Sequence, residues 1–503
     1  MSEDPEERPS DRDLGVLASG AGISLLGRIA NGGLVFAYGV VLARLLEVRD
    51  VGAMLLGLTL IRVAELLSRM GLEFGALHFV AIANGDGRSS IVRATVRNAV
   101  RFGLLFSVFV SLGLVAGAPV LARVFELPEL AVVLRTLALS LPLTSTTMIL
   151  LAALLGLKEV VKNTLGEKIA LPGINLILCT LLLAAGLELN GASMAYVAAA
   201  LFTMPLAAYF FHRSAPLARS PSAPVPAMEL LRFSVPVVLV VMCTDLLAWT
   251  DTIMLGLLRP ADEVGIYGSA MRVAIIAGMF TASFCALFVP TISDLYNRGE
   301  MRQLGYLYKA VGKWIFLATL PVFFVVMLLA PNLMLLFGPA YVPGSAPLVV
   351  LTLTQLVAAC GGAVSFMLMM SGRQKLILVD ALFACVLNLA LNAALIPRFG
   401  MLGAASATCI SIAAFNAMAL VQVWRTMEMH PYHWGYAKIL AVGAIAFLAV
   451  SWLRSEFGAS GSATEFALYS AGYLALYLVI LLATGMDAED KVILDKLRRK
   501  LDL

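Results

Sequence analysis

The sequence predicts an all-α integral membrane protein, on the evidence of its composition, its apolar segments and the placement of its basic residues. Of its 503 residues, 60% are hydrophobic and 14% are charged, and the mean hydropathy is +0.92. A soluble domain carries about 25% charged residues. The apolar segments are about 20 residues or longer, as transmembrane helices require, whereas membrane barrel strands show short alternating stretches. We therefore expect a helical protein that crosses the membrane many times.

Apolar segments recur along the whole chain, and they predict about 14 transmembrane helices. The first two segments are long, so we expect a tilt or a kink, which their glycines allow. The expected ranges are 14–46, 51–80, 97–121, 129–156, 164–187, 191–211, 230–258, 264–290, 308–330, 346–370, 374–397, 401–424, 436–453 and 465–484.

The basic residues predict the orientation of the chain. If the amino terminus is cytoplasmic, inner loops and tails hold 25 of the 36 Lys and Arg residues, and outer loops hold six. The other five lie inside apolar segments. Cytoplasmic loops of membrane proteins carry such an excess of Lys and Arg. We therefore expect both termini in the cytoplasm. The net charge of +4 is therefore no evidence for a nucleic-acid partner, because the excess of basic residues in cytoplasmic loops accounts for it.

The polar breaks predict two lobes, a linker, an extra helix pair and a tail. The longest break is rich in Pro, Ser and Ala, a composition typical of a semi-rigid linker. The basic tail should lie on anionic membrane lipids. The expected organisation is a cytoplasmic amino-terminal tail 1–13, an N-lobe 14–212 with helices 1–6, a cytoplasmic linker 213–228, a C-lobe 229–425 with helices 7–12, helices 13–14 at 436–484, and a cytoplasmic tail 485–503.

Two local matches indicate that the lobes are repeats. LLEVRDVG at 45–52 matches LLRPADEVG at 257–265, after the first helix of each half. NLILCTLLLAAGLELNGAS at 175–193 matches NLALNAALIPRFGMLGAAS at 388–406 after a one-residue gap. Two matches in the same order favour a parallel repeat, which two-lobed transporters use with a site between the lobes. We therefore expect two pseudo-symmetric six-helix lobes.

Three stretches carry a resemblance to a known family. They are ARLLEVRDVGAMLLG at 43–57, DTIMLGLLRPADEVGIYGSAMR at 251–272 and NLALNAALIPRFGMLGAASAT at 388–408. The chain resembles the polysaccharide and oligosaccharide flippases of the Wzx type. These belong to the multidrug/oligosaccharidyl-lipid/polysaccharide exporter superfamily. The resemblance covers essentially the whole chain and includes the predicted helix number.

The resemblance implies a V-shaped pair of lobes that moves polyprenyl-diphosphate-linked sugars across the bacterial inner membrane by alternating access. Such a transporter serves the biosynthesis of polysaccharide, O-antigen or exopolysaccharide. Its partners would be the lipid-linked sugar, membrane lipids, and a polysaccharide polymerase or glycosyltransferase. The motifs identify the superfamily better than its branches. A lipid II flippase and a cation-coupled drug antiporter therefore remain alternatives.

Charged residues inside the apolar segments are the candidate site. The basic ones are Arg28, Arg62, Arg69, Arg135 and Arg272. Charges at membrane depth usually face a cavity or a partner. Arg28 shares a helix face with Asn31, and Arg62 should lie at a depth similar to that of Arg28. Guanidinium suits bidentate contacts to phosphate. One interpretation is that Arg28, Arg62 and Asn31 hold a diphosphate; the alternative pairs Arg28 or Arg62 with Glu65.

The second half supplies the candidate ion site. Asp245 and Asp251 lie on the seventh helix, and either one, or Glu65 in the first half, could bind a coupling proton or cation. The alternative is an ion pair of Asp251 with Arg272, which is itself a candidate for binding substrate. Asn388 and Asn392 lie one turn apart and share a face, so they could contact sugar or join helices.

Other features exclude competing functions or carry no site. We expect Asp380, near the cytoplasmic end of its helix, to be satisfied by Arg373 and Lys375. No metal spacing is present among the cysteines and histidines, and no cofactor is expected apart from the coupling proton or sodium ion. A membrane glycosyltransferase or polymerase would need sizeable outer loops, whereas the outer loops here are short. We therefore expect a transporter and no enzyme.

Overall fold

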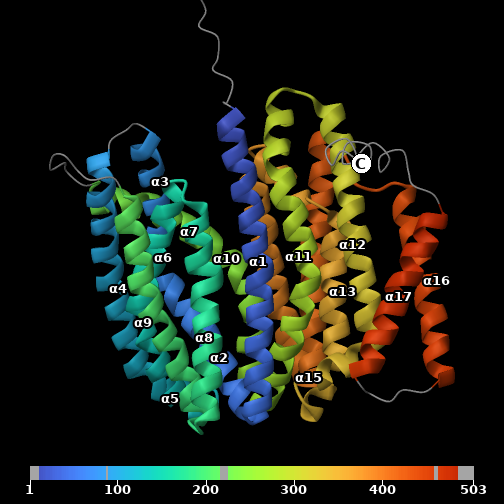
Figure 1. Ribbon diagram of the computed structural model, residues 1–503, viewed down its shortest axis with the longest axis horizontal. Helices are drawn as coiled ribbons and strands as arrows, with labels where there is room; N and C mark the ends of the chain where they lie inside the picture. The colour runs from blue at the N-terminus through green and yellow to red at the C-terminus, as the bar shows by residue number, and fades with distance from the viewer. Residues whose placement is uncertain (1–10, 86–88, 216–224, 458–462, 485–503) are drawn as a thin grey trace, which may run out of the picture. The chain divides into compact units, whose positions relative to one another are not determined.

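The computed structural model is helical throughout the part of the chain that it describes, and that part contains no strand (Figure 1). The central part of the expected linker, the first ten residues and the basic tail lie outside the described residues. Among the described residues, 11 helices are long and apolar enough to cross a membrane, or up to 12 if one bent pair counts as one span. The protein is therefore a multi-pass membrane protein, and the expected number of about 14 stays a prediction. The described residues are 11–85, 89–215, 225–457 and 463–484.

The chain divides into two compact units, Met1–Asp245 and Leu246–Leu503. The division falls inside the helix α10 (Ala227–Leu258), so this helix contributes residues to both units. The expected boundary at 213–228 lies earlier in the chain.

The described residues of the first unit form ten helical elements and the beginning of α10. The predicted segment 51–80 consists of two helices, and the predicted segment 129–156 is bent by 43° between α5 and α6. The elements are α1 (Asp11–Leu45), α2 (Val48–Arg69), α3 (Leu72–Gly85), α4 (Ser89–Val124), α5 (Glu129–Ala138), α6 (Ser140–Gly156), α7 (Val160–Thr164), the π-helical turn η1 (Leu165–Ala170), α8 (Leu171–Ala184) and α9 (Glu188–Ser214).

The break between α2 and α3 depends on a glycine. Met70 and Gly71 both have positive φ, 50° and 74°, which ends α2. A Cβ added at Gly71 would lie 2.6 Å from the carbonyl oxygen of Ser234 on α10. Gly71 therefore provides both the backbone conformation and the close approach of α10.

The beginning of α10 packs on α3. The ring of His78 stacks on Phe233, with centroids 4.1 Å apart. Leu230 is fully buried in a cluster with Leu72 and Ala76. This segment of α10 is therefore part of the packed interior of the first unit.

The second unit begins with the end of α10 and continues to α17. The predicted segment 346–370 corresponds to two helices. The elements are α11 (Ala261–Asn297), α12 (Met301–Leu335), the 3-10 helix η2 (Pro339–Gly344), α13 (Ser345–Gly361), α14 (Val364–Met370), α15 (Gln374–Met427), α16 (Trp434–Phe457) and α17 (Ala463–Ala483).

The long element α15 is broken at Gly400, where φ is 55° and ψ is −133°. The backbone N–H of Met401 donates to Oε2 of Glu263 on α11 at 3.2 Å. Arg259 in turn contacts Oε1 of Glu263 at 2.7 Å. The family motifs around 260–267 and 397–400 therefore meet at this break. Below, the first arm is 374–399 and the second arm is 401–427.

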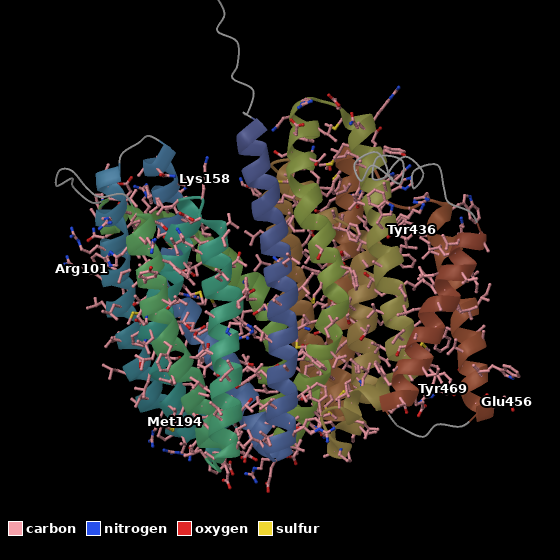
Figure 2. All side chains as sticks on the ribbon, in the orientation of Figure 1. Arg101, Lys158, Met194, Tyr436, Glu456 and Tyr469 are labelled. Atoms are coloured by element: carbon pink, nitrogen blue, oxygen red, sulfur yellow. The ribbon has the colours of Figure 1, made fainter. Side chains whose placement is uncertain are left out.

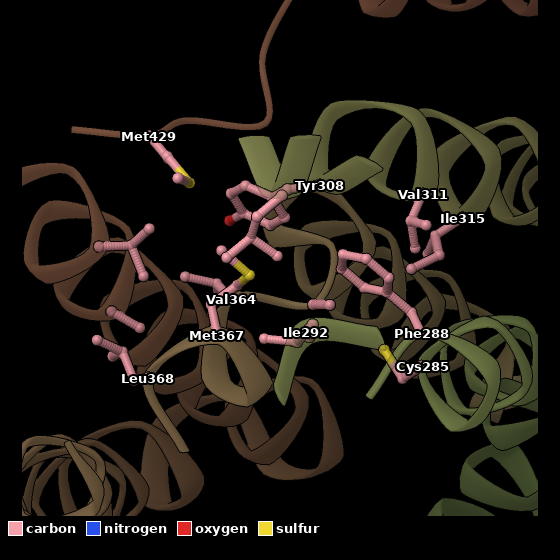
Figure 3. Close-up of a cluster of buried hydrophobic side chains, with 14 of the residues drawn as sticks. Cys285, Phe288, Ile292, Tyr308, Val311, Ile315, Val364, Met367, Leu368 and Met429 are labelled. Atoms are coloured by element: carbon pink, nitrogen blue, oxygen red, sulfur yellow. The ribbon is translucent and has the colours of Figure 1, made fainter. Parts of the chain in front are cut away.

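Two hydrophobic clusters organise the described residues of the second unit. The first joins α11, α12 and the region from α13 to α15, and it includes Phe288, Tyr308 and Met367 (Figure 3). The second joins α12 to α16 and α17 and contains the buried tyrosines 469, 473 and 477. The helix pair α16–α17 is therefore packed against α12 through aromatic side chains.

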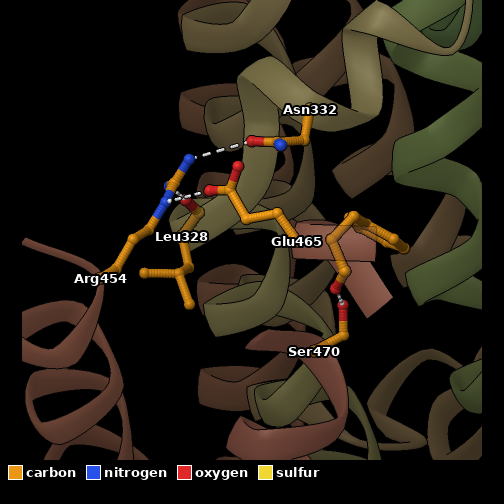
Figure 4. A network of polar contacts seen from close by, with 6 residues as sticks. Leu328, Asn332, Arg454, Glu465 and Ser470 are labelled. Atoms are coloured by element: carbon orange, nitrogen blue, oxygen red, sulfur yellow. Dashed lines mark hydrogen bonds and ion pairs between the residues drawn. The ribbon is translucent and has the colours of Figure 1, made fainter. Parts of the chain in front are cut away.

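A polar network holds the same helix pair to a kink in α12. The helix is distorted at Leu329, where φ is −124°, and Pro331 follows two residues later. Arg454 at the end of α16 donates to the carbonyl of Leu328, to Oδ1 of Asn332 and to Oε1 of Glu465 (Figure 4). A carbonyl near the kink thus gains a charged donor.

Large apolar side chains cover exposed helix faces in both units (Figure 2). On α4, Leu105, Phe109 and Leu112 are 65%, 76% and 64% exposed and lie on one face. On α9, Met194 is 50% exposed. An exposed apolar face of this kind suits contact with lipid acyl chains, which agrees with the assignment of the chain as a membrane protein.

Candidate functional site

The most complete polar site in the described part of the second unit is built around Asp251. This carboxylate lies on the part of α10 that follows Leu246, and its exposure is 0%. Four donor side chains come from three helical segments: Tyr267 from α11, Asn388 and Asn392 from the first arm of α15, and Thr408 from the second arm. The break at Gly400 allows both arms to reach the same carboxylate.

Each oxygen of Asp251 accepts two hydrogen bonds. Oδ1 accepts from Nδ2 of Asn392 at 2.8 Å and from Nδ2 of Asn388 at 3.3 Å. Oδ2 accepts from the hydroxyl of Thr408 at 2.5 Å and from the hydroxyl of Tyr267 at 2.6 Å. A buried carboxylate is costly unless it is paired or hydrogen-bonded. Here neutral donors fill all four positions.

The two asparagines and the threonine also bind each other. Asn392 donates to Oδ1 of Asn388 at 3.0 Å, and Asn388 donates to the hydroxyl of Thr408 at 3.0 Å. One acceptor is left over, since Oδ1 of Asn392 is buried without a hydrogen-bond partner among the described residues. A proton or a small cation could bind the carboxylate of Asp251 only if some of its four donors turned away, and the unused amide oxygen of Asn392 would then be available as an additional acceptor.

One interpretation of the sequence needs correction here. The expected ion pair of Asp251 with Arg272 is not formed in the described part of the chain. Arg272 donates instead to the carbonyl of Gly268 at 3.3 Å and interacts electrostatically with Tyr341. Helix position along the chain predicts depth, but it does not predict which way a side chain points around the helix axis.

The shared face of Asn388 and Asn392 is confirmed, because the two side chains bind each other and the same carboxylate. Both are 0% exposed. This burial argues against the direct contact with sugar that the sequence suggested. Instead, both asparagines are hydrogen-bond donors to Asp251. The repeat match aligns Asn388 with Asn175 and Asn392 with Cys179, so the paired asparagines are particular to the second half.

The first unit presents two exposed arginines on helices of membrane-spanning length. Arg28 lies 17 residues from each end of α1, and Arg62 lies 14 residues after the start of α2. Both side chains are exposed. The expected ion pair with Glu65 is absent among the described residues; the hydroxyl of Tyr196 donates to Glu65 at 3.2 Å instead. Asn31 is half-buried on α1.

A second group of charges in the first unit lies near the end of α2. Arg69 pairs with Glu73 at 3.4 Å across the break between α2 and α3. Asp245, the last residue of this unit, is half-buried and interacts electrostatically with Arg62 and Arg69. Positive and negative groups are therefore partly balanced here, while Arg62 keeps an exposed guanidinium.

Three participants were missed by the sequence interpretation: Tyr196, Tyr267 and Thr408. Tyr267 and Thr408 both lie inside the stretches that carry the family resemblance. The family motifs therefore contained both residues, but no local pattern links them to Asp251, which is 16 residues from Tyr267 and 157 residues from Thr408. Nothing in the sequence marked Tyr196 as the partner of Glu65.

Comparison with known families decides the membership of the chain. The family model described as "Polysaccharide biosynthesis protein" matches residues 17–296. This match covers more than half of the 503 residues. The chain belongs to the polysaccharide biosynthesis protein family. A second family model, MatE, matches residues 236–394, which include Asp251, Asn388 and Asn392.

Two relatives from Haloferax volcanii are named as flippases. The chain is 26% identical to the probable low-salt glycan biosynthesis flippase Agl15 over 33% of its own length and 35% of that protein. It is 24% identical to the probable flippase AglR over 49% of its length and 52% of that protein. The chain thus matches about a third to a half of the length of these curated relatives.

Solved structures share the fold of this family member. A structure of the lipid II flippase MurJ in an inward closed conformation has a TM-score of 0.71 and 13% identity, with coverage of 95% of this chain and 100% of that chain. An inward-facing multidrug resistance MATE family transporter of the MOP superfamily has a TM-score of 0.68 and 16% identity, with coverage of 81% and 98%. These likenesses show a transporter fold.

Proposed function

We propose that the protein is a flippase that moves a polyprenyl-diphosphate-linked oligosaccharide from the cytoplasmic to the outer leaflet of the cell membrane, for polysaccharide biosynthesis. Alternating access of the two halves, with both termini in the cytoplasm, is part of the proposal. The family membership and the two relatives named as flippases support it. The exposed arginines of the first unit are the observation that carries it.

An exposed guanidinium at membrane depth needs water or an anion beside it, because contact with acyl chains costs several kcal/mol. Arg28 and Arg62 are exposed and, among the described residues, form no ion pair. Guanidinium never deprotonates at physiological pH and binds phosphate oxygens in pairs. A diphosphate that crosses the membrane is an anion of matching chemistry, and Asn31 on the same helix could add an amide donor.

The proposal is tested by flipping in proteoliposomes. The substrate is a fluorescent polyprenyl-diphosphate oligosaccharide, and a membrane-impermeant glycosidase reports how much reaches the outer leaflet. We expect Arg28→Ala and Arg62→Ala each to slow flipping about 10- to 100-fold, since a charge-assisted hydrogen bond contributes about 1.5–3 kcal/mol. Lysine at either position should restore flipping in part, because it keeps the charge without the planar fork.

Arg298→Ala is the matched control. Its guanidinium is exposed and pairs with Asp294 one turn away, so its loss should leave flipping unchanged. Wild-type rates in correctly inserted Arg28→Ala and Arg62→Ala proteins would reject the arginines as the site. Equal transport of lipid II would favour the alternative peptidoglycan function, and cation-driven export of drugs would favour the antiporter.

We further propose that Asp251 is the coupling residue of this transporter, with Asn388, Asn392, Tyr267 and Thr408 as its ligands. A proton or sodium ion on this carboxylate would change the charge of the buried network and so bias the access states. Arg272 remains a candidate contact for the substrate, because a guanidinium suits an anionic headgroup. Asp245 and Glu65 would partly balance the positive charge of the arginines in the first unit.

This role is tested by the ion dependence of flipping. Asp251→Asn should abolish the dependence on pH or sodium while the protein stays folded, because asparagine cannot ionise. Asp262→Asn removes an exposed carboxylate from the first turn of α11 and should change nothing. If Asp251→Asn keeps the wild-type dependence on both ions, the network has a structural role alone.

A further inference from the structure

A second fully buried carboxylate lies in the second unit, apart from the Asp251 site. Asp380 is on the first arm of α15, and its exposure is 0%. Oδ1 of Asp380 accepts a hydrogen bond of 2.7 Å from Nε2 of Gln422 on the second arm. The sequence interpretation assigned Asp380 to Arg373 and Lys375. That was wrong, because the side chain turns to the opposite arm and Arg373 donates to Ser371.

The contact leaves one oxygen of each side chain without a partner among the described residues. Oδ2 of Asp380 and Oε1 of Gln422 are both buried and accept no hydrogen bond there. An ionised carboxylate is an acceptor only, and so is the oxygen of an amide. The amide can therefore satisfy one oxygen of an ionised Asp380, while its own oxygen adds a second unsatisfied acceptor. A buried acceptor without a partner destabilises the folded protein, because it has lost its hydrogen bonds to water.

The described surroundings of Asp380 supply no charge that would stabilise an anion. The helices α13 and α14 contain no Asp, Glu, Lys, Arg or His. On the second arm of α15, Arg425 is exposed. On α11, Asp294 is paired with Arg298. On its own arm, Lys375 is exposed. An ionised Asp380 would thus depend on one amide hydrogen bond in an apolar interior.

We propose that Asp380 is a proton-binding site, and that its bound proton closes an acid–amide pair with Gln422 across the two arms of α15. The protonated Oδ2 donates to Oε1 of Gln422, while Nε2 of Gln422 donates to Oδ1. One proton thereby satisfies both orphaned oxygens. A sodium ion is the less fitting occupant, because small hard cations take about six oxygen ligands, whereas the described side chains offer two unused oxygens here.

The site is distinct from the Asp251 network. Asp380 precedes Asn388 by eight residues on the first arm, which corresponds to about 12 Å along a helix. The hydrogen bonds of Asn388 to Thr408 and of Gln422 to Asp380 join the same two arms. The seam between the arms therefore contains two carboxylates with different partners, and this proposal does not depend on the transported cargo.

Infrared spectroscopy of the purified full-length protein tests the protonation state directly. At neutral pH the wild type should show a carboxylic-acid C=O band that Asp380→Asn lacks. Asp262→Asn, which removes an exposed carboxylate, should leave that band in place. A wild-type spectrum identical to that of Asp380→Asn in this region would overturn the proposal, because Asp380 would then be ionised and bridged by water.

The pH dependence of unfolding in detergent gives a second, independent readout. The amide introduced by Asp380→Asn keeps a donor toward Gln422, so this variant should fold. An unfolded aspartate ionises near pH 4. The folded wild type then holds one more proton than the unfolded chain above about pH 5, and its stability falls as pH rises. Relative to the variant, the unfolding equilibrium constant of the wild type should rise about tenfold per pH unit.

Parallel pH curves for the two proteins would overturn the proposal. Should Asp380→Asn fail to fold, Gln422→Leu provides the alternative test. It removes the amide but leaves the carboxylic acid in place, so the infrared band should persist and move to higher frequency. A band that stays at the wild-type position in Gln422→Leu would contradict the pairing.

Discussion

The hydroxyl of Thr408 makes the shortest hydrogen bond to Asp251, at 2.5 Å. Removing this hydroxyl tests how much the network contributes to stability. Thr408→Val keeps the shape of the side chain and deletes the donor. A hydrogen bond to a charged group contributes about 1.5–3 kcal/mol. Because three other donors remain on the carboxylate, we expect the free energy of unfolding to fall by about 2 kcal/mol, with no change of fold.

Thr352→Val provides the matched control. Thr352 is 0% exposed on α13 in the same unit, and its hydroxyl donates at 2.8 Å to the carbonyl of Leu348 in its own helix. The carbonyl of Leu348 lies inside a helix and already accepts a main-chain hydrogen bond, so it stays satisfied when the hydroxyl of Thr352 is removed. We expect a loss of about 0.5 kcal/mol or less, because the deleted bond is neutral and local.

The assay is denaturant unfolding in mixed micelles, with a double-mutant cycle against Asp251→Asn. If the hydroxyl acts through the carboxylate, Thr408→Val should cost clearly less in the Asp251→Asn background, with a coupling energy of about 1 kcal/mol or more. Equal losses in Thr408→Val and Thr352→Val, together with additive effects in the cycle, would refute the assigned network.

Two further predictions concern the backbone of the second unit. Gly400→Ala should destabilise the protein by about 1–3 kcal/mol, since φ is 55° there and the new Cβ would lie 2.5 Å from Oε2 of Glu263; unchanged thermal unfolding would contradict this. Arg454→Met should increase hydrogen exchange at the kink of α12 and at the start of α17, because three acceptors lose one donor group. Arg298→Met, at an exposed helix end, should leave exchange in both segments unchanged.

The membrane class and many helix positions could be predicted because hydropathy acts locally along the chain. The pairing of Asn388 with Asn392 was equally accessible, since residues four apart share a helix face. The partners of Asp251 and Asp380 were not, because they depend on how separate helices rotate against each other. Charge attraction suggested Arg272 and Arg373, whereas packing selected neutral hydroxyls and amides, whose desolvation is cheaper than that of a second ion.

The helix break at Met70–Gly71 also shows what a sequence can and cannot supply. A kink in the long segment 51–80 was expected from its length and glycines, and the structure confirms it. The position of the break depends on α10, because the carbonyl of Ser234 lies so close to residue 71 that only a glycine fits there. That contact joins residues more than 160 positions apart, so no local pattern reports it.

The division of α10 has a consequence for protein engineering. The polar stretch before this helix is the natural place to exchange halves between homologous proteins. A crossover there would transfer Leu230, Phe233 and Ser234 with the second half, although all three pack on the first unit around α3. Chimaeras joined at the linker should therefore fold poorly unless α3 comes from the same parent as α10. A junction after Asp245 would respect the packing of both parents.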